Sequence, residues 1–395
     1  MTAATPALAG SEPQERSLRA RLVEFLLVGG LTPLLFPLSW LARRALGIDA
    51  AEYAIGFTTF YAAFVINDPH FTVTYLLFYR DARGRASGAS FRGWQRARWL
   101  LAGVVAPVVL AGWAIAGLAL RSPPILGGMI QLMFFLVGWH YVKQGFGVLT
   151  VLSARRGVRF APGERLAILA HCWSGWAYAW ASPYDPGREV EEKGLVYRTL
   201  AHPIGLERAT FWIFVASGVV AAALLVRKRV REGRLPIATP LVALVCSVWA
   251  WSIWSSVDPL VRYVIPALHS VQYLYFVWLL RAPEAREREG PPHFETSAKV
   301  RLGVLAVSAL GLGWLLFHGA PTALDDLFTP KRSRFTDMGP TPYFAALYAF
   351  VNIHHYLMDS VVWRRENPET RWLQRCPPER RGRRCWFTRD PGCCR

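Results

Sequence analysis

Most of the nine histidines of this 395-residue chain lie inside apolar runs rather than in the loops between them. Four polar clusters interrupt these runs, and each contains at least one histidine. They are Asn67-Asp68-Pro69-His70, Trp139-His140-Tyr141-Val142-Lys143-Gln144, His269-Ser270-Val271-Gln272-Tyr273, and Asn352-Ile353-His354-His355-Tyr356 followed by Asp359. Because ionisable groups are costly in hydrocarbon, we expect each cluster to have a buried partner or a function.

The last cluster has a spacing that suits a metal ligand. Asn352, His355 and Asp359 fall at i, i+3 and i+7, which puts them on one face of a helix. Asp359 could accept the ring N–H of His355 and leave the second ring nitrogen free to bind a metal. The adjacent His354 and His355 point about 100° apart on a helix, so they need two different partners.

Several imidazoles with one or two carboxylates suit iron, copper or zinc, and suit magnesium or calcium poorly. We therefore predict a metal centre with the ligands His70, His140, His269, His354 and His355. Asp359 would orient His355, and Asp68 would be a further ligand or a proton carrier. Lys143 is predicted to be a third catalytic group. The residues predicted to line the substrate cavity are Asn67, Tyr141, Gln144, Gln272, Tyr273, Asn352 and Tyr356.

Transmembrane helices are the elements that must position these residues. Hydrophobic residues make up 53% of the chain and charged residues 18%. The apolar residues come in runs of about 20, the length that crosses a hydrocarbon core of roughly 30 Å. We predict an all-α fold, a polytopic bundle of ten transmembrane helices. Their ranges are 22–41, 53–79, 99–120, 124–151, 165–183, 209–226, 238–257, 259–280, 302–318 and 342–363.

Basic residues predict the orientation of these helices. The loops after the second, fourth, sixth, eighth and tenth helices are rich in Arg or Lys, and all lie on one side of the membrane. This side is expected to be cytoplasmic, so both termini would be cytoplasmic, whereas Arg43 and Arg44 would lie outside. We expect a disordered arm over 1–21, a transmembrane domain over 22–363 and a basic, cysteine-containing tail over 364–395, in the inner (plasma) membrane.

Six of the histidines share one depth in this topology. His70, His140, His171, His269, His354 and His355 lie roughly 9–17 Å from the cytoplasmic boundary at about 1.5 Å per residue. A shared layer indicates one polar centre inside the membrane. The expected partners are the lipid bilayer, an apolar small-molecule substrate and an electron donor. Nucleic acid is not expected despite the net charge of +18, because the basic residues lie in short loops beside apolar runs.

The abundance of histidine within membrane spans and the His354-His355 pair resemble the histidine-rich membrane oxygenases, namely the fatty-acid desaturases, the hydroxylases and the membrane carotenoid-cleaving oxygenases. The resemblance implies non-haem iron that oxidises a lipid or isoprenoid-like substrate. The desaturase pattern of one HxxxH box and two HxxHH boxes is absent from the sequence, so no residue role is transferred.

Other interpretations of the same residues are open at this point. Two histidines on facing helices could bind haem b, and copper is a further candidate. Alternatively, buried His, Asp and Lys groups could be the proton relay of a proton-coupled transporter. A scaffold without a site of its own is a third class. Asp68 and Lys143 could neutralise each other as a charge pair, and His171 could be a packed, hydrogen-bonded core residue.

Overall fold

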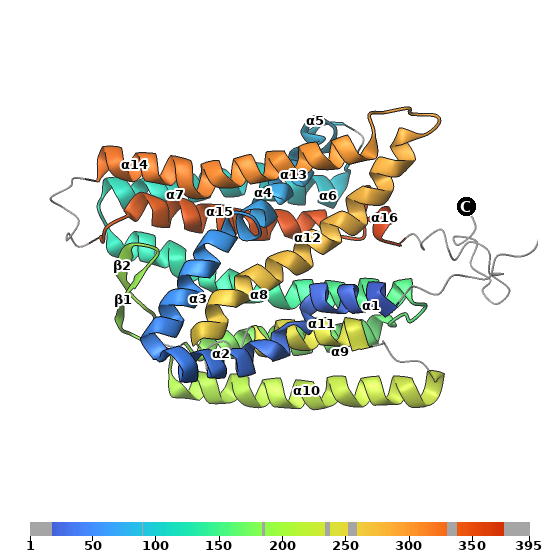
Figure 1. The fold of residues 1–395 in the computed structure, drawn as a ribbon, viewed down its shortest axis with the longest axis horizontal. Helices are drawn as coiled ribbons and strands as arrows, with labels where there is room; N and C mark the ends of the chain where they lie inside the picture. Colours follow the sequence, from blue (N-terminus) through green and yellow to red (C-terminus); the bar gives the residue numbers. More distant parts are fainter. Residues whose placement is uncertain are drawn as a thin grey trace, which may run out of the picture.

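The computed structural model describes residues 18–88, 90–183, 186–233, 238–251, 259–329 and 338–374. Apart from one short β-hairpin, the described chain is helical, which confirms the predicted all-α class. Figure 1 shows most helices running side by side along the long axis, with α12 (Pro259–Glu289) crossing them obliquely. The helix α8 (Pro123–Arg155) lies in the middle of the bundle, and α10 (Ile204–Glu232) lies along one edge.

Five helices are long and apolar enough to cross a membrane, and they mark the chain as a membrane protein. Two of these five helices include π-helical turns: α6 (Gly93–Leu100) with η2 (Leu101–Val105) and α7 (Ala106–Ala119), and α13 (Ala298–Trp314) with η5 (Leu315–Gly319) and α14 (Ala320–Phe328). The other three are α8, α10 and α12. At about 1.5 Å per residue, their 27 to 33 residues exceed the roughly 30 Å of a hydrocarbon core.

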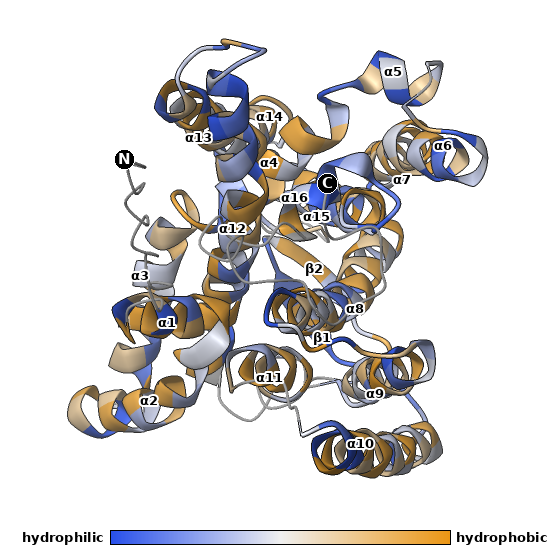
Figure 2. Ribbon diagram, turned by 90° about the vertical axis from the view of Figure 1, so that its right-hand side faces the viewer, coloured by the Kyte–Doolittle hydropathy of each residue, from blue (hydrophilic) through white to orange (hydrophobic). Residues whose placement is uncertain are grey.

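The outer faces of these helices are apolar. Val108 on α7, Trp212 on α10 and Val307 on α13 have exposed fractions of 68%, 66% and 69%. Figure 2 shows this as orange, apolar ribbon on helices at the outside of the bundle. A helix that leaves large apolar side chains uncovered over its length suits contact with lipid rather than water.

The first predicted span, 22–41, is bent rather than straight. The segments α1 (Leu18–Phe25) and η1 (Leu26–Gly30) meet α2 (Thr32–Leu46) at an angle of 67°. Gly29 has a φ of 128°, which glycine adopts without strain, and Pro33 starts the second half. The two halves together make one broken span or a re-entrant loop.

The second predicted span, 53–79, is divided. The helix α3 (Ile48–Ala63) ends before α4 (Asn67–Tyr79) begins, and Pro69 lies in the first turn of α4, where its missing N–H is tolerated. The chain is therefore broken shortly before His70. By contrast, α12 continues through Pro266 as one helix, although a proline inside a helix can also interrupt it.

Three further predicted spans are helices, but each is too short or too polar to be identified as membrane-spanning from its length and hydropathy. The helices α9 (Pro162–Ala181) and α15 (Pro342–Val362) are 20 and 21 residues long, but both carry polar residues. The helix α11 (Ala238–Val245) continues into η3 (Cys246–Ala250), and residues 252–258 of the predicted span 238–257 lie outside the described part of the chain. In α15 the polar residues are buried, because the helix packs against α4, α7 and α8.

The remaining elements cover the two ends of the bundle. At one end, β1 (Glu189–Glu192) and β2 (Leu195–Arg198) form an antiparallel hairpin that the sequence analysis did not predict. Its two turn residues, Lys193 and Gly194, have positive φ values of 55° and 76°, as a tight hairpin turn requires. At the other end lie α5 (Ala82–Ala86), η7 (Pro368–Thr370) and α16 (Arg371–Gln374).

Candidate metal centre

Four helices that are far apart in sequence bring four histidines together. His70 lies on α4, His140 on α8, His269 on α12 and His355 on α15, and their exposed fractions are 1%, 5%, 2% and 0%. The ring centroids of His70 and His355 are 4.5 Å apart, and those of His140 and His355 are 4.9 Å apart. These four residues and Asp359 are called the histidine cluster below.

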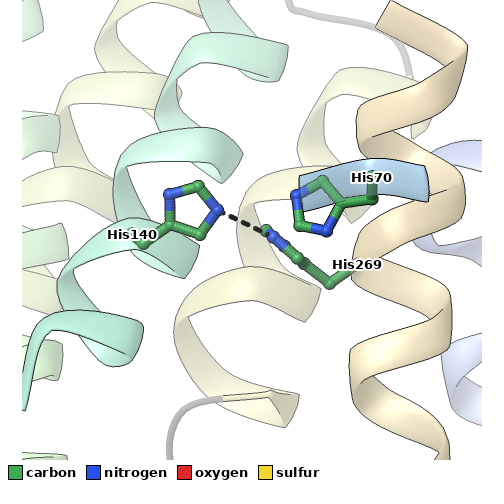
Figure 3. A group of neighbouring side chains, drawn as sticks. All are labelled: His70, His140 and His269. Carbon is green, nitrogen blue, oxygen red and sulfur yellow. Dashed lines mark hydrogen bonds between the residues drawn. The ribbon is translucent and has the colours of Figure 1, made fainter. Parts of the chain in front are cut away.

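The first half of the histidine cluster contains three imidazoles. The Nε2 atoms of His140 and His269 are 2.9 Å apart, and Figure 3 shows both rings turned toward each other, with His70 beside them. One nitrogen from each of the three residues lies within 4.8 Å of the others. Because His–metal bonds are about 2.0–2.1 Å long, two nitrogens at right angles on one ion lie about 3 Å apart. The His140–His269 separation therefore suits either a hydrogen bond or a shared ion.

The second half contains a carboxylate. Asp359 Oδ2 lies 3.4 Å from His355 Nε2 and 3.6 Å from His140 Nδ1. Ligand atoms of His140, His355 and Asp359 all fall within 4.8 Å of one another. The predicted proximity of Asp359 to His355 is therefore present, although the pair does not form a hydrogen bond with normal geometry.

Several ring nitrogens of the histidine cluster have no hydrogen-bond partner in the described part of the chain. They are His70 Nε2, His269 Nδ1 and both nitrogens of His355. The other nitrogen of His70, Nδ1, lies 3.0 Å from the hydroxyl of Ser270. A buried polar atom without a partner costs about 1–3 kcal/mol, so four at one place call for a ligand that satisfies them.

The other carboxylate oxygen of Asp359 is held by hydrogen bonds. Tyr273 donates its hydroxyl to Asp359 Oδ1 at 2.7 Å, and the indole N–H of Trp363 donates to the same oxygen at 3.2 Å. Thr74 lies 2.5 Å from the Tyr273 hydroxyl. These contacts fix the carboxylate so that Oδ2 faces His140 and His355, an arrangement that orients metal ligands in many proteins.

Gln144 on α8 and Gln272 on α12 connect the histidine cluster to η1 by hydrogen bonds. Gln144 donates to the carbonyl of His269 at 3.2 Å and to the side-chain oxygen of Gln272 at 2.7 Å. Gln272 in turn donates to the carbonyl of Val28 in η1 at 2.7 Å. Both were predicted to line a substrate cavity, and the structure gives them hydrogen bonds between helices.

The remaining residues of the predicted cavity lining are also near the histidines. The ring of Tyr141 lies 4.2 Å from that of His269, and the ring of Tyr356 lies 4.7 Å from that of His140. Tyr356 donates to the side-chain oxygen of Asn352, one turn away. Asn67 accepts a hydrogen bond from Ser270, the residue that also contacts His70.

His354 is separated from the histidine cluster, contrary to its predicted role as a ligand. Its Nε2 lies 3.0 Å from the carbonyl of Ala102, which can only accept, so this nitrogen carries the proton. Its Nδ1 therefore accepts from the hydroxyl of Tyr75 at 3.0 Å. Both nitrogens are occupied, because the neighbouring position on α15 turns the ring about 100° away from that of His355.

Asp68 and Lys143 do not form the charge pair considered above, and neither reaches the histidine cluster by a hydrogen bond in the described part of the chain. Asp68 Oδ2 lies 2.8 Å from Nε2 of His318, whose ring stacks on Phe64 at 3.8 Å. The Lys143 ammonium lies over the ring of Trp139, 4.4 Å from its centroid. His318 was not predicted as part of a polar cluster, because it lies at the end of an otherwise apolar run.

His171 lies on α9, outside the histidine cluster. Its Nδ1 is 3.0 Å from the hydroxyl of Ser217, and its ring stacks on Phe214 with centroids 4.9 Å apart. This is the packed, hydrogen-bonded arrangement considered for it in the sequence analysis.

Comparison with known proteins adds no relative to this description. No protein-family description, curated protein or solved structure matches the chain. The fold and the site together define a helical membrane protein with two buried groups of His and Asp ligands that could hold a metal ion.

Proposed function

We propose that this protein is an integral membrane oxidoreductase whose histidine cluster binds a transition metal, and that it oxidises a lipid or isoprenoid-like substrate. One observation carries the proposal: four helices place four histidines and Asp359 together, with ring nitrogens that have no partner in the described part of the chain. A packed core would normally satisfy such atoms with hydroxyl or carbonyl groups, as it does for His171.

The donor set favours non-haem iron, with copper as the second choice. Imidazole nitrogens with one carboxylate oxygen suit iron, copper and zinc, and of these iron and copper supply redox chemistry. Haem is less compatible with the geometry, because two axial histidines must face each other across the macrocycle. His140 and His269, with Nε2 atoms 2.9 Å apart, leave no space for a macrocycle between them.

The proposed substrate is apolar and would reach the site from the bilayer. Hydroxylation of a C–H bond by dioxygen consumes two electrons and two protons, which reduce the second oxygen atom to water. A separate electron donor is therefore part of the proposal.

When bound, the metal would supply the oxidation chemistry. The protein would hold the ligands in place and keep Asp359 oriented through Tyr273 and Trp363.

We also propose the ten-span topology with both termini in the cytoplasm of an inner-membrane protein. Ion pairs between loops support a common side for three of the basic loops. Arg80 follows α4 and lies 2.9 Å from Glu284, which is near the end of α12. Arg98 lies 3.2 Å from Glu366 after α15, and Arg85 pairs with Glu369. The predicted tail therefore begins with a segment that packs against the same end of the bundle.

A proton-coupled transporter is the second candidate, and the broken helices favour it. The 67° bend between η1 and α2 and the gap between α3 and α4 are the kind of discontinuity that carriers place near their substrate sites. In this alternative the histidine cluster would relay protons and would hold no stoichiometric metal.

Metal content separates the two candidates. The full-length protein would be purified in detergent without chelator, and iron, copper and zinc would be quantified together with a visible spectrum. The His140→Gln variant is the test, and the His171→Gln variant is the matched control, since both histidines are 5% exposed on central parts of their helices. The proposal predicts at least one iron or copper per chain, lost in the first variant and kept in the second. Protein without metal would overturn the proposal and favour the transporter.

A further inference from the structure

His140 belongs to both ligand groups of the histidine cluster, and it uses a different ring nitrogen on each side. Its Nε2 lies 2.9 Å from His269 Nε2, whereas its Nδ1 lies 3.6 Å from Asp359 Oδ2. The two nitrogens of an imidazole are separated by a ring carbon, and their in-plane lone pairs diverge. A single ion therefore cannot bind both.

Each side of the His140 ring has enough ligands for its own ion. On one side are His70 and His269, and on the other are His355 and Asp359. Each side also contains a buried nitrogen without a hydrogen-bond partner in the described chain, His70 Nε2 on the first and His355 Nε2 on the second. Three protein ligands with one open position are the usual arrangement of a catalytic transition-metal site.

We infer that His140 bridges two metal ions, one bound with His70 and His269 and the other with His355 and Asp359. This inference rests on the proposed function and deepens it, because a single ion in either half would already satisfy the proposal above. In a bridged pair, the two ions would exchange electrons through the His140 ring.

Charge balance predicts that the second ion to bind is held more weakly than the first. The first ion binds the bare nitrogen of a neutral His140 ring. The second must displace the proton from the other nitrogen, which leaves an imidazolate. Two divalent ions would then face two protein negative charges, Asp359 and His140, so hydroxide or another oxygen anion must occupy the open positions. Because uncompensated buried charge is costly, the second ion is expected to bind less tightly than the first.

Copper titration tests the bridge. Chelator-treated full-length protein would be titrated with Cu(II), and bound copper and its electron spin resonance would be measured at each step. Cys376, Cys385, Cys393 and Cys394 would be replaced by serine in every sample, so that these four thiols do not bind copper. The other two cysteines, Cys172 and Cys246, are buried. The inference predicts two equivalents per chain and, at saturation, a spin count below two because the ions couple through His140.

Variants of the two halves sharpen the result. His70→Gln and Asp359→Asn should each leave one equivalent with an uncoupled spin, and the control His171→Gln should keep two. Circular dichroism and a single gel-filtration peak would show that each variant is folded. Saturation of the parent at one equivalent would overturn the bridge and leave the proposed function standing. Two equivalents with uncoupled spins would also overturn it. No bound copper would overturn the bridge too, whereas the proposed function is decided separately by the iron and copper content of protein that was never exposed to chelator.

Discussion

Two buried histidines of this protein, His171 and His140, differ in the groups that surround their rings. His171 and His140 are equally buried, at 5% exposure. His171 has a hydroxyl partner in Ser217 and a stacked partner in Phe214, while Ser217 itself contacts Ser174 at 2.6 Å. The polar groups next to the His140 ring are the imidazole of His269 and the carboxylate of Asp359. Burial alone therefore does not distinguish the two environments. The difference is that the imidazoles beside His140 include ring nitrogens without a hydrogen-bond partner in the described chain, those of His70, His269 and His355.

The same contrast holds between two neighbouring residues on α15. His354 donates to the Ala102 carbonyl and accepts from Tyr75, which fixes it between helices. His355 has no hydrogen-bond partner for either nitrogen in the described chain and faces Asp359 instead. One residue of the pair stabilises helix packing, and the other belongs to the candidate metal centre.

The largest expected effect is the loss of metal on replacement of His140. Because His140 is the one ligand shared by both groups, His140→Gln should weaken metal binding by more than the roughly 10–100-fold that follows loss of an outer partner. Competition with a chelator of known affinity measures the effect. If His140→Gln bound metal as tightly as His171→Gln, the contrast between the two environments would have no functional meaning.

Replacement of Asp359 by asparagine should have the next largest effect. The change keeps the size of the side chain but removes the negative charge that faces His140 and His355. We expect a loss of metal affinity of about 10–100-fold, since an anionic ligand or orienting group is removed. The same chelator competition checks it. An affinity within twofold of the parent would show that Asp359 only accepts the hydrogen bonds of Tyr273 and Trp363 and has no part in metal binding.

A smaller effect is expected for Tyr273→Phe. The variant loses the hydroxyl that donates to Asp359 Oδ1, while Trp363 continues to donate to that oxygen. One lost hydrogen bond should lower the free energy of unfolding by about 1 kcal/mol and weaken metal binding by less than Asp359→Asn does. Thermal unfolding and chelator competition on the same sample measure both. A larger metal loss than in Asp359→Asn would point to a direct role for the tyrosine.

The smallest effect on metal is expected for His354→Phe. This variant leaves the Ala102 carbonyl and the Tyr75 hydroxyl without their partner, which should cost about 1–3 kcal/mol of stability. Metal content should remain that of the parent, because neither nitrogen of His354 faces the histidine cluster. Metal analysis beside thermal unfolding separates the two effects. A folded His354→Phe protein without metal would return His354 to the ligand set.

The sequence alone predicted the helical membrane class, and four of the five residues of the histidine cluster were predicted as candidate metal ligands. Apolar run length fixes where long helices lie, and common depth brought His70, His140 and His269 into one layer. The sequence does not show which of His354 and His355 joins the histidine cluster. This depends on which face of α15 contacts α8 and which contacts η2. Helical periodicity gives the angle between the two side chains but does not identify the neighbour on each side.

Other contacts could not be predicted for the same reason. A charge pair between Asp68 and Lys143 was one open alternative, whereas Asp68 contacts His318, 250 residues away in the sequence. The bend at Gly29 was not predicted because an apolar run predicts length and not direction. Long-range partners of single polar residues require the packing of the helices, which one sequence does not contain.

Anomalous diffraction at the iron edge would show directly whether iron binds at the histidine cluster. Crystals of the full-length protein, supplied with Fe(II) under nitrogen, would be measured on both sides of the edge. We expect an iron peak about 2.0–2.2 Å from a ring nitrogen of His140, with His269 or His355 as a second ligand. Iron peaks only at other positions, with the histidine cluster empty in iron-replete crystals, would contradict it.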